Sequence, residues 1–174
     1  SGHVDATLDL YKSVLAKHRD TGLCLQSYLY RTADDLEALL PLDPSIRLVK
    51  GAYDEPVDVA HAKKGEVDQR FVHLTGMLMR ARAEGGRGRP VIGTHDPRMV
   101  SEANRLAYEF NLNKGSYEFA MLYGIDQAQQ GRLARGGHAL RVLLSYGSAW
   151  FPWYMRRLAE RPANVLFVLK QLVR

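Results

Sequence analysis

The sequence has a single cysteine among its 174 residues, which excludes an internal disulfide and a cysteine-based zinc ribbon. It also lacks an apolar run long enough for a membrane-spanning helix, and its first residues lack the basic and apolar segments of a signal peptide. No G-x-G-x-x-G turn, P-loop or H-E-x-x-H motif occurs. What is present is the usage of an ordinary globular domain, with 46% apolar and 25% charged residues.

The net charge is +5, from 24 basic and 19 acidic residues. Acidic and basic residues are interspersed without a run of five like charges, so we expect no nucleic-acid partner. Cys24 lies in the apolar run Leu23-Cys24-Leu25 and is predicted to be buried as a small hydrophobic residue. A lone cysteine fits a reduced, cytoplasmic setting. The positive charge leaves open peripheral association with the inner face of an anionic membrane.

Apolar periodicity predicts helices and strands in alternation. We expect strands over residues 23–29, 45–51, 90–94, 114–122 and 138–145. We expect helices over residues 3–19, 33–40, 57–84, 97–110, 125–135, 150–160 and 162–173. The helix at 97 has a strong start signal, because Asp96 can cap it and Pro97 suits its first position. Five strands, each followed by a helix, predict an α/β fold with a parallel sheet.

Two parallel architectures compete. A doubly wound sheet usually carries a glycine-rich phosphate turn after its first strand, and none follows residues 23–29. In a (βα)8 barrel, functional residues gather at the carboxyl ends of the strands, which is the distribution found below. Five strands are too few for a barrel, so we expect one domain over residues 1–174 that forms the C-terminal five strand–helix units of a TIM-like barrel in a longer chain. Alone, its open edges and uncovered apolar interior predict aggregation or self-pairing.

Polar side chains interrupt the apolar strands or follow them directly. A charged residue in a buried parallel strand needs a partner or a ligand. For one such residue an ion pair is an equally good interpretation, but several at one end of a sheet favour a binding site. Lys-Gly alone is a common turn, and a lone histidine more often bonds to backbone. The residues concerned are Gln26, Arg47, Lys50, Gly51, Thr94, His95, Glu118 and Arg141.

Residues 150–162 read Trp-Phe-Pro-Trp-Tyr-Met-Arg-Arg-Leu-Ala-Glu-Arg-Pro. On a helix, Arg156 and Arg157 lie about one turn before Glu160. Two adjacent arginines with an acidic partner suit a guanidinium clamp on an anionic substrate. A solvated helix face is the commoner outcome of such a pattern, but the surrounding aromatic residues favour the clamp or a place in the core.

These segments, in this order, resemble the proline dehydrogenase family, including the proline dehydrogenase domain of proline utilisation A. The sequence looks most like the short monofunctional bacterial enzymes. The resemblance covers nearly the whole chain and is carried by residues 47–53 (RLVKGAY), 93–96 (GTHD), 117–124 (YEFAMLYG) and 146–164. It implies a (βα)8 barrel, of which this chain supplies strands four to eight. It also implies FAD as cofactor, oxidation of L-proline to 1-pyrroline-5-carboxylate by hydride transfer to flavin N5, and a membrane quinone as electron acceptor.

The resemblance implies roles for individual residues. Arg156 and Arg157 would clamp the proline carboxylate, and Glu160 would hold Arg157 and reach the flavin. Arg47 would lie near the isoalloxazine as a catalytic and positioning residue. Tyr53 and Leu143 would line the substrate site. The implied cofactor contacts are Gln26, Arg47, Lys50, Gly51, Ala52, Thr94, His95 and Glu160.

Two positions depart from the family pattern. Leu143 stands where members usually carry a tyrosine that packs on the substrate ring, which keeps hydroxyproline or a related cyclic amino acid open as substrate. Ala120 stands where glutamine is common, which removes one cofactor contact. The family's substrate lysine and a strand with an aspartate and a glutamate lie upstream, so we expect this chain alone to lack part of the active site.

The residues leave two alternative functions, the electron acceptor and the oligomeric state open. A non-catalytic flavin-binding fragment is one alternative to the enzyme. Another barrel enzyme, which grips a phosphate with Arg156 and Arg157, is a second, although the order of the motifs disfavours it. The electron acceptor and the oligomeric state, including a homo-oligomer, do not follow from the residues.

Overall fold

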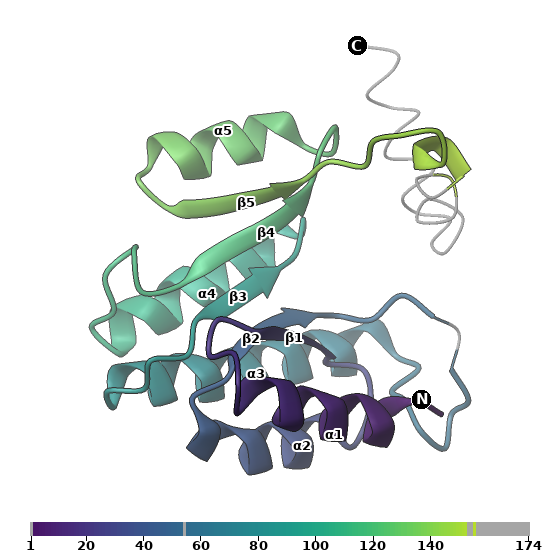
Figure 1. Ribbon diagram of the computed structural model, residues 1–174. Coiled ribbons are helices and arrows are strands. Elements are labelled where there is room, and N and C mark those ends of the chain that lie inside the picture. Colours follow the sequence, from purple (N-terminus) through teal and green to yellow (C-terminus); the bar gives the residue numbers. More distant parts are fainter. Residues whose placement is uncertain (1, 54, 153–154, 156–174) are drawn as a thin grey trace.

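The computed structural model describes residues 2–53, 55–152 and 155, and Figure 1 shows them as an arc of strands with helices around its outer side. The helices are α1 (Val4–Leu15), α2 (Thr32–Leu39), the short 3-10 helix η1 (Leu40–Leu42), α3 (Lys64–Ala83), α4 (Pro97–Glu109) and α5 (Gln127–Arg135). The strands are β1 (Gly22–Gln26), β2 (Ser45–Val49), β3 (Pro90–Gly93), β4 (Glu118–Leu122) and β5 (Ala139–Leu143).

The described strands form one parallel sheet in the order β1-β2-β3-β4-β5. Each strand therefore pairs with the next one along the chain. Right-handed crossovers in a constant direction put every connecting helix on the same side of the sheet. This is the winding of a (βα)8 barrel, whereas a doubly wound sheet reverses its strand order and carries helices on both faces. The expected α/β fold of the TIM-barrel type is confirmed.

The helix-covered face of the sheet holds the core. One row of paired residues crosses all the strands and consists of Leu25, Leu48, Ile92, Phe119 and Leu140. Leu48, Ile92 and Phe119 are completely buried against the helices. Burial of such side chains stabilises the fold by about 1.5–3 kcal/mol each.

The opposite face, here called the open face, carries the alternating residues. They include Cys24, Gln26, Arg47, Val49, Val91, Gly93, Glu118, Ala120, Arg141 and Leu143. All of them except Glu118 are exposed or half-buried. Glu118 accepts hydrogen bonds from Arg141 Nε at 2.8 Å and from Arg89 Nη1 at 3.1 Å. The open face is thus more polar than the apolar interior that we expected.

Several boundaries differ from the sequence-based ones. The long helix begins at Lys64 instead of residue 57, because residues 57–63 bond to the segment after β1: Tyr30 N–H donates to Val59 O and His61 N–H to Tyr28 O. β4 begins at Glu118 rather than 114, because the Asn113 side chain accepts from Gly115 N–H and closes a turn there. Cys24 is exposed, not buried, since it lies on the open face.

The expected C-terminal helices fall mostly on residues that the structure does not describe. Residues 150–152 and 155 are helical. The remainder of the helix expected over 150–160, and the helix expected over 162–173, lie outside the described residues. Across residues 2–53, 55–152 and 155, no helix has both the length and the apolar character required to cross a bilayer.

Candidate functional site

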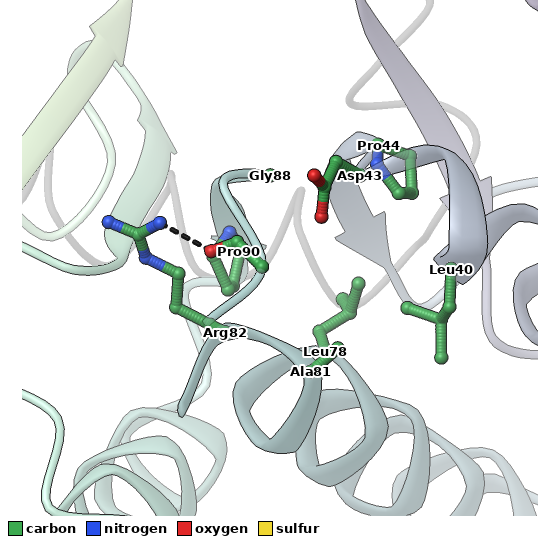
Figure 2. A pocket seen from close by; sticks show the side chains of 9 residues that line it. Leu40, Asp43, Pro44, Leu78, Ala81, Arg82, Gly88 and Pro90 are labelled. Atoms are coloured by element: carbon green, nitrogen blue, oxygen red, sulfur yellow. Dashed lines mark hydrogen bonds between the residues drawn. The ribbon is translucent and has the colours of Figure 1, made fainter. Parts of the chain in front are cut away.

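The carboxyl ends of the parallel strands meet at one edge of the sheet, and the expected site residues lie along it. Gln26 ends β1, Lys50 follows β2, and Leu143 ends β5. Thr94 and His95 directly follow β3. A small cavity of about 20 Å³ lies at the other end of the sheet, where Asp43, Pro44, Gly88 and Pro90 precede or begin β2 and β3 (Figure 2). It contains none of the expected site residues.

A larger groove of about 300 Å³ runs along β1. It brings together Gln26 at the end of the strand and Tyr53 from the loop after β2. The remaining wall comes from α1, β1, α2 and the residues that adjoin them, and from Glu55 in the loop after β2. Its other residues are His3, Val4, Thr7, Leu8, Leu23, Cys24, Leu25, Leu29, Thr32 and Asp35. Two expected site residues that are distant in sequence therefore share one concave surface.

Arg47 lies on the open face in the middle of β2. Its register neighbours are Cys24 on β1 and Val91 on β3, neither of which is acidic. No carboxylate within the described ranges pairs with its guanidinium, whereas Arg141 on the same face bonds to Glu118 through Nε and Nη2. Arg47 thus keeps its donors for a ligand, and the alternative of a structural ion pair finds no partner among these residues.

Gly93 packs closely against β2 on the open face, beside Arg47. A Cβ at Gly93 would lie 2.7 Å from Val49 Cγ1, 3.0 Å from Leu48 O and 3.6 Å from Arg47 Cγ. The aliphatic stem of Arg47 therefore passes next to a residue without a side chain. Because Val49 and the Leu48 carbonyl fill the place that a Cβ would take, glycine is required at this position for the close packing of β3 on β2.

The Lys50 ammonium lies between two carboxylates. Its Nζ donates to Asp68 Oδ1 of α3 and, at 2.8 Å, to Asp96 Oδ2, and the Lys50 side chain is only 12% exposed. Lys64 also bonds to Asp68, and Arg98 bonds to Asp96 at 3.1 Å. Burial opposes the charged form of both carboxyls, but the hydrogen bonds that Asp68 accepts from Lys50 and Lys64, and Asp96 from Lys50 and Arg98, prevail and lower both pKa values.

Sequence reasoning missed this network, although part of the signal was visible. Asp68 lies four residues after Lys64, a spacing that pairs side chains on a helix. Asp96 caps α4 through the Arg98 N–H, as its place before Pro97 predicted. The contacts of Lys50 with these carboxylates depend on the tertiary fold. Asp68 lies 18 residues after Lys50 in the sequence and Asp96 lies 46 residues after it, so no local pattern joins them.

The turn after β2 contains a glycine, Gly51, with a left-handed backbone conformation. Gly51 has a φ of +111°, which L side chains rarely adopt. The backbone before it is held by β1, since Ser27 N–H donates to Val49 O at 2.8 Å and Tyr28 N–H to Lys50 O at 3.0 Å. Gly51 is buried, Ala52 is half-buried and Tyr53 is 53% exposed.

His95 is held as a neutral imidazole. Its Nε2 accepts the backbone N–H of Leu122 at 2.9 Å, so the ring proton belongs on Nδ1. Burial lowers the pKa of His95, although the nearby Asp126 opposes this effect. Nδ1 is buried without a hydrogen-bond partner in the part of the chain that the structure describes. A buried N–H donor of this kind costs free energy unless a ligand accepts from it.

Two neighbours support the His95 segment. Thr94 is buried, and its hydroxyl accepts the Asp96 N–H at 3.1 Å. Gln129 is buried as well, and its side-chain amide donates to His95 O at 3.4 Å. The loop between β3 and α4 is thus bonded to both α4 and α5, which keeps the imidazole in place.

Two hydrogen-bond donors near the carboxyl edge have no partner within residues 2–53, 55–152 and 155. They belong to the guanidinium of Arg47 and to Nδ1 of His95. These features fit a flavin cofactor that uses its ring for stacking and its heteroatoms for hydrogen bonds. Over residues 2–53, 55–152 and 155, no group of three His, Cys, Asp or Glu side chains is arranged to hold a metal ion.

The substrate side is described only in part. Leu143 is 45% exposed on the open face, with Leu122 as its neighbour in register. It adds an apolar surface beside the site without a hydroxyl. Arg156, Arg157 and Glu160, which the sequence assigns to the substrate clamp, lie outside the described residues.

Comparisons with known proteins agree on one family. The family model "Proline dehydrogenase" matches residues 2–170. The chain is 37% identical to proline dehydrogenase 1 of Bacillus subtilis (strain 168), over 99% of this chain and 55% of that protein. It is 39% identical to proline dehydrogenase 2 of Bacillus subtilis subsp. natto, over 97% of this chain and 54% of that protein. A proline dehydrogenase of Deinococcus radiodurans is 37% identical, over 98% of this chain and 54% of that protein. The chain thus spans about half the length of these curated relatives.

Solved structures share the fold at lower identity. Proline utilization A from Bdellovibrio bacteriovorus, inactivated by N-propargylglycine, superposes with a TM-score of 0.77 at 21% identity, over 90% of this chain and 18% of that one. Proline utilization A from Corynebacterium freiburgense gives a TM-score of 0.74 at 24% identity, over 97% of this chain and 21% of that one. This chain therefore shares its fold with part of those much longer proteins.

Proposed function

Because this chain belongs to the proline dehydrogenase family, we propose that the protein oxidises L-proline to 1-pyrroline-5-carboxylate and that the carboxyl edge of its sheet holds FAD for this reaction. The observation that carries the proposal is the Arg47 guanidinium, which has no acidic partner among the described residues and whose stem passes beside Gly93 on the open face. A structural arginine in a sheet would have an acidic partner, as Arg141 has in Glu118.

The reaction is a two-electron oxidation. A hydride leaves C5 of proline with its electron pair, a double bond forms between C5 and nitrogen, and the nitrogen gives up its proton. FAD, when bound, would accept the hydride and later pass the electrons to a quinone. Since no strong acid or nucleophile is needed, the protein contributes orientation and a dry, charge-matched pocket.

The residues of this chain would share that task. Arg47 would hold the cofactor ring in place and balance negative charge that develops on it. The N–H of His95 Nδ1 would donate to a cofactor acceptor and so gain the partner it lacks among the described residues. Leu143 and Tyr53 would line the substrate side. Further cofactor contacts are assigned to Gln26, Lys50, Gly51, Ala52, Thr94 and Glu160, and the carboxylate clamp to Arg156 and Arg157.

The ionic environment of Lys50 refines its proposed role. Its ammonium already neutralises Asp68 and Asp96, so a second anion would have to compete with two short ion pairs. The backbone of residues 50–52 is then the part of this segment that would contact FAD. The ammonium instead fastens the turn to α3 and to the start of α4.

The wider setting is also proposed. The protein would be cytoplasmic, with peripheral access to membrane quinone aided by its net charge of +5. Residues 1–174 would form the C-terminal part of one barrel domain, in line with the half-length match to the curated relatives. A homo-oligomer is compatible with all of this.

The test uses the natural gene product that carries this sequence. The purified protein should be yellow and release FAD on denaturation. Anaerobic addition of L-proline should bleach the flavin faster than hydroxyproline or pipecolate does. A colourless protein would refute the flavoenzyme proposal. A yellow protein that L-proline leaves oxidised would favour either a different cyclic amino acid or a non-catalytic flavin-binding role.

A matched variant addresses the departure at position 143. Leu143→Tyr restores the residue type that the family usually has, on the open face beside the site. If Leu143 sets specificity, this variant should shift the ratio of kcat/KM between proline and hydroxyproline. An unchanged ratio would mean that Leu143 only fills space.

A further inference from the structure

The aromatic ring of Tyr28 occupies the space directly beside Gly51. A Cβ added to Gly51 would lie 2.3 Å from Tyr28 Cδ1 and 2.6 Å from both Cγ and Cε1. Real Cβ atoms do not approach other atoms so closely. The φ of +111° at Gly51 adds a second requirement for glycine. The ring and the glycine are therefore complementary parts of one contact.

The backbone of Tyr28 connects the turn to a second loop. Its N–H donates to Lys50 O at 3.0 Å, and its C=O accepts the N–H of His61 at 2.8 Å. His61 belongs to the loop that precedes α3, and it contacts Tyr30 edge to face with ring centroids 4.4 Å apart. Tyr28 thus connects the segment after β1 to Lys50, just before Gly51, and to the loop that precedes α3.

The burial of Tyr28 is separate from the main core. With 7% of its surface exposed, it packs in a small cluster with Leu29, Ala60 and Val67. The main core under the sheet is a different cluster. The Tyr28 ring therefore supports this corner of the molecule more than it supports the sheet.

The turn is held from a second direction by charge. Lys50, immediately before Gly51, is anchored to Asp68 and Asp96 by its ammonium. The ion pairs hold the Lys50 side chain, and the Tyr28 ring lies against Gly51, the residue that follows. The backbone of residues 50–52 therefore has little conformational freedom. Pre-organised backbone of this kind lowers the entropic cost of binding a ligand.

We propose that Tyr28 is a positioning residue, whose ring fixes the backbone of the Lys50–Ala52 turn in the conformation that binds the flavin. This inference rests on the proposed function, because it assumes that the turn contacts FAD. It predicts that the loss of the ring weakens flavin binding beyond any effect on stability.

The experiment uses the natural gene product, from which the flavin is removed and into which FAD is titrated back. The variants are Tyr28→Ala, Tyr28→Leu and Tyr28→Phe, with Tyr11→Ala as control. Tyr11 has the same side chain and a similar exposure of 5%, but it packs in the main core. The Kd for FAD and the melting temperature of the flavin-free protein are measured for each.

We expect Tyr28→Ala and Tyr28→Leu to raise the Kd for FAD about 10-fold or more, and Tyr28→Phe to stay within about 2-fold of wild type. Tyr11→Ala should lower the melting temperature and leave the Kd unchanged. Equal Kd values for wild type and Tyr28→Leu would overturn the inference. If Tyr28→Ala does not fold, the inference is tested by the Kd for FAD of Tyr28→Leu against that of Tyr28→Phe, which keeps the ring.

A double-mutant cycle with Gly51→Ala tests the contact itself. Tyr28→Ala removes the ring carbons that an added Cβ would meet, whereas the strain of alanine at a φ of +111° is the same in both backgrounds, so Gly51→Ala should raise the Kd for FAD more in the wild-type background than in Tyr28→Ala. Equal effects in both backgrounds would contradict the inference. A wild-type protein that binds no flavin would overturn the proposed function and this inference together, whereas normal flavin binding in Tyr28→Leu overturns this inference alone.

Discussion

Replacement of Lys50 by methionine removes the cation that two carboxylates share. The side chains involved are largely buried, with 12% exposure for Lys50, 14% for Asp68 and 19% for Asp96. Each lost charge-assisted hydrogen bond is worth about 1.5–3 kcal/mol. Lys64 and Arg98 still bond to the two carboxylates, which compensates part of the loss. We therefore expect Lys50→Met to lower the free energy of unfolding by about 2–4 kcal/mol.

The pH dependence of this loss follows from the carboxyl groups. The pKa values of Asp68 and Asp96 lie below the unfolded value of 3.8, because the hydrogen bonds they accept, from Lys50 in both cases, outweigh the effect of burial. A carboxyl with a lowered pKa contributes its full stability above the unfolded pKa and loses it as the pH falls through the folded one. The difference between wild type and Lys50→Met should therefore be constant from about pH 5 to 8 and shrink below about pH 4.

The assay is urea unfolding of the natural gene product at several pH values, with Lys64→Met as matched control. Lys64 bonds to Asp68 as well, but its side chain is 68% exposed. Its loss should cost less than about 1 kcal/mol. Equal losses for the two variants would refute the reasoning, because burial of the ammonium would then not matter. A loss for Lys50→Met that persists unchanged into acid would refute it too.

Three further predictions concern the same edge and the open face. His95→Phe should lower the free energy of unfolding by about 1–3 kcal/mol in urea, because it leaves the Leu122 N–H without its acceptor. Since burial lowers the pKa of His95, wild-type stability should also fall as the pH drops below 6.5, and His95→Phe should lack this component. Glu118→Gln should destabilise the protein by about 1–3 kcal/mol, measured the same way, because Arg89 and Arg141 lose their shared carboxylate. Gly93→Val should lower the ratio of flavin to protein after purification, because its side chain meets Val49 and fills the open face beside Arg47.

Local patterns were enough to predict the frame of this fold. Alternation in Ile46-Arg47-Leu48 predicts one buried and one open side for β2, and the structure buries Ile46 and Leu48 while Arg47 is exposed. The start of α4 also follows from two adjacent residues, Asp96 and Pro97. Such signals act within a few residues, so a single sequence carries them.

Features that depend on distant segments were not predictable in this way. The apolar neighbours of Cys24 indicated burial, but an open sheet face leaves it exposed. The delayed start of α3 results from hydrogen bonds between residues 57–63 and the end of β1. The two partners of Lys50 and the ring beside Gly51 likewise come from other elements. These contacts exist only once the crossovers have placed the helices.

The proposed function depends most on Arg47, which lies on the open face in the middle of β2 without an acidic partner among the described residues. The most direct measurement is the anaerobic rate of flavin reduction by L-proline, recorded by rapid mixing for the wild-type natural gene product and for Arg47→Met. We expect saturable reduction in the wild type and a rate about 100-fold or more lower in Arg47→Met with flavin still bound. Equal rates in the two proteins, or a flavin that L-proline leaves oxidised in the wild type, would contradict it.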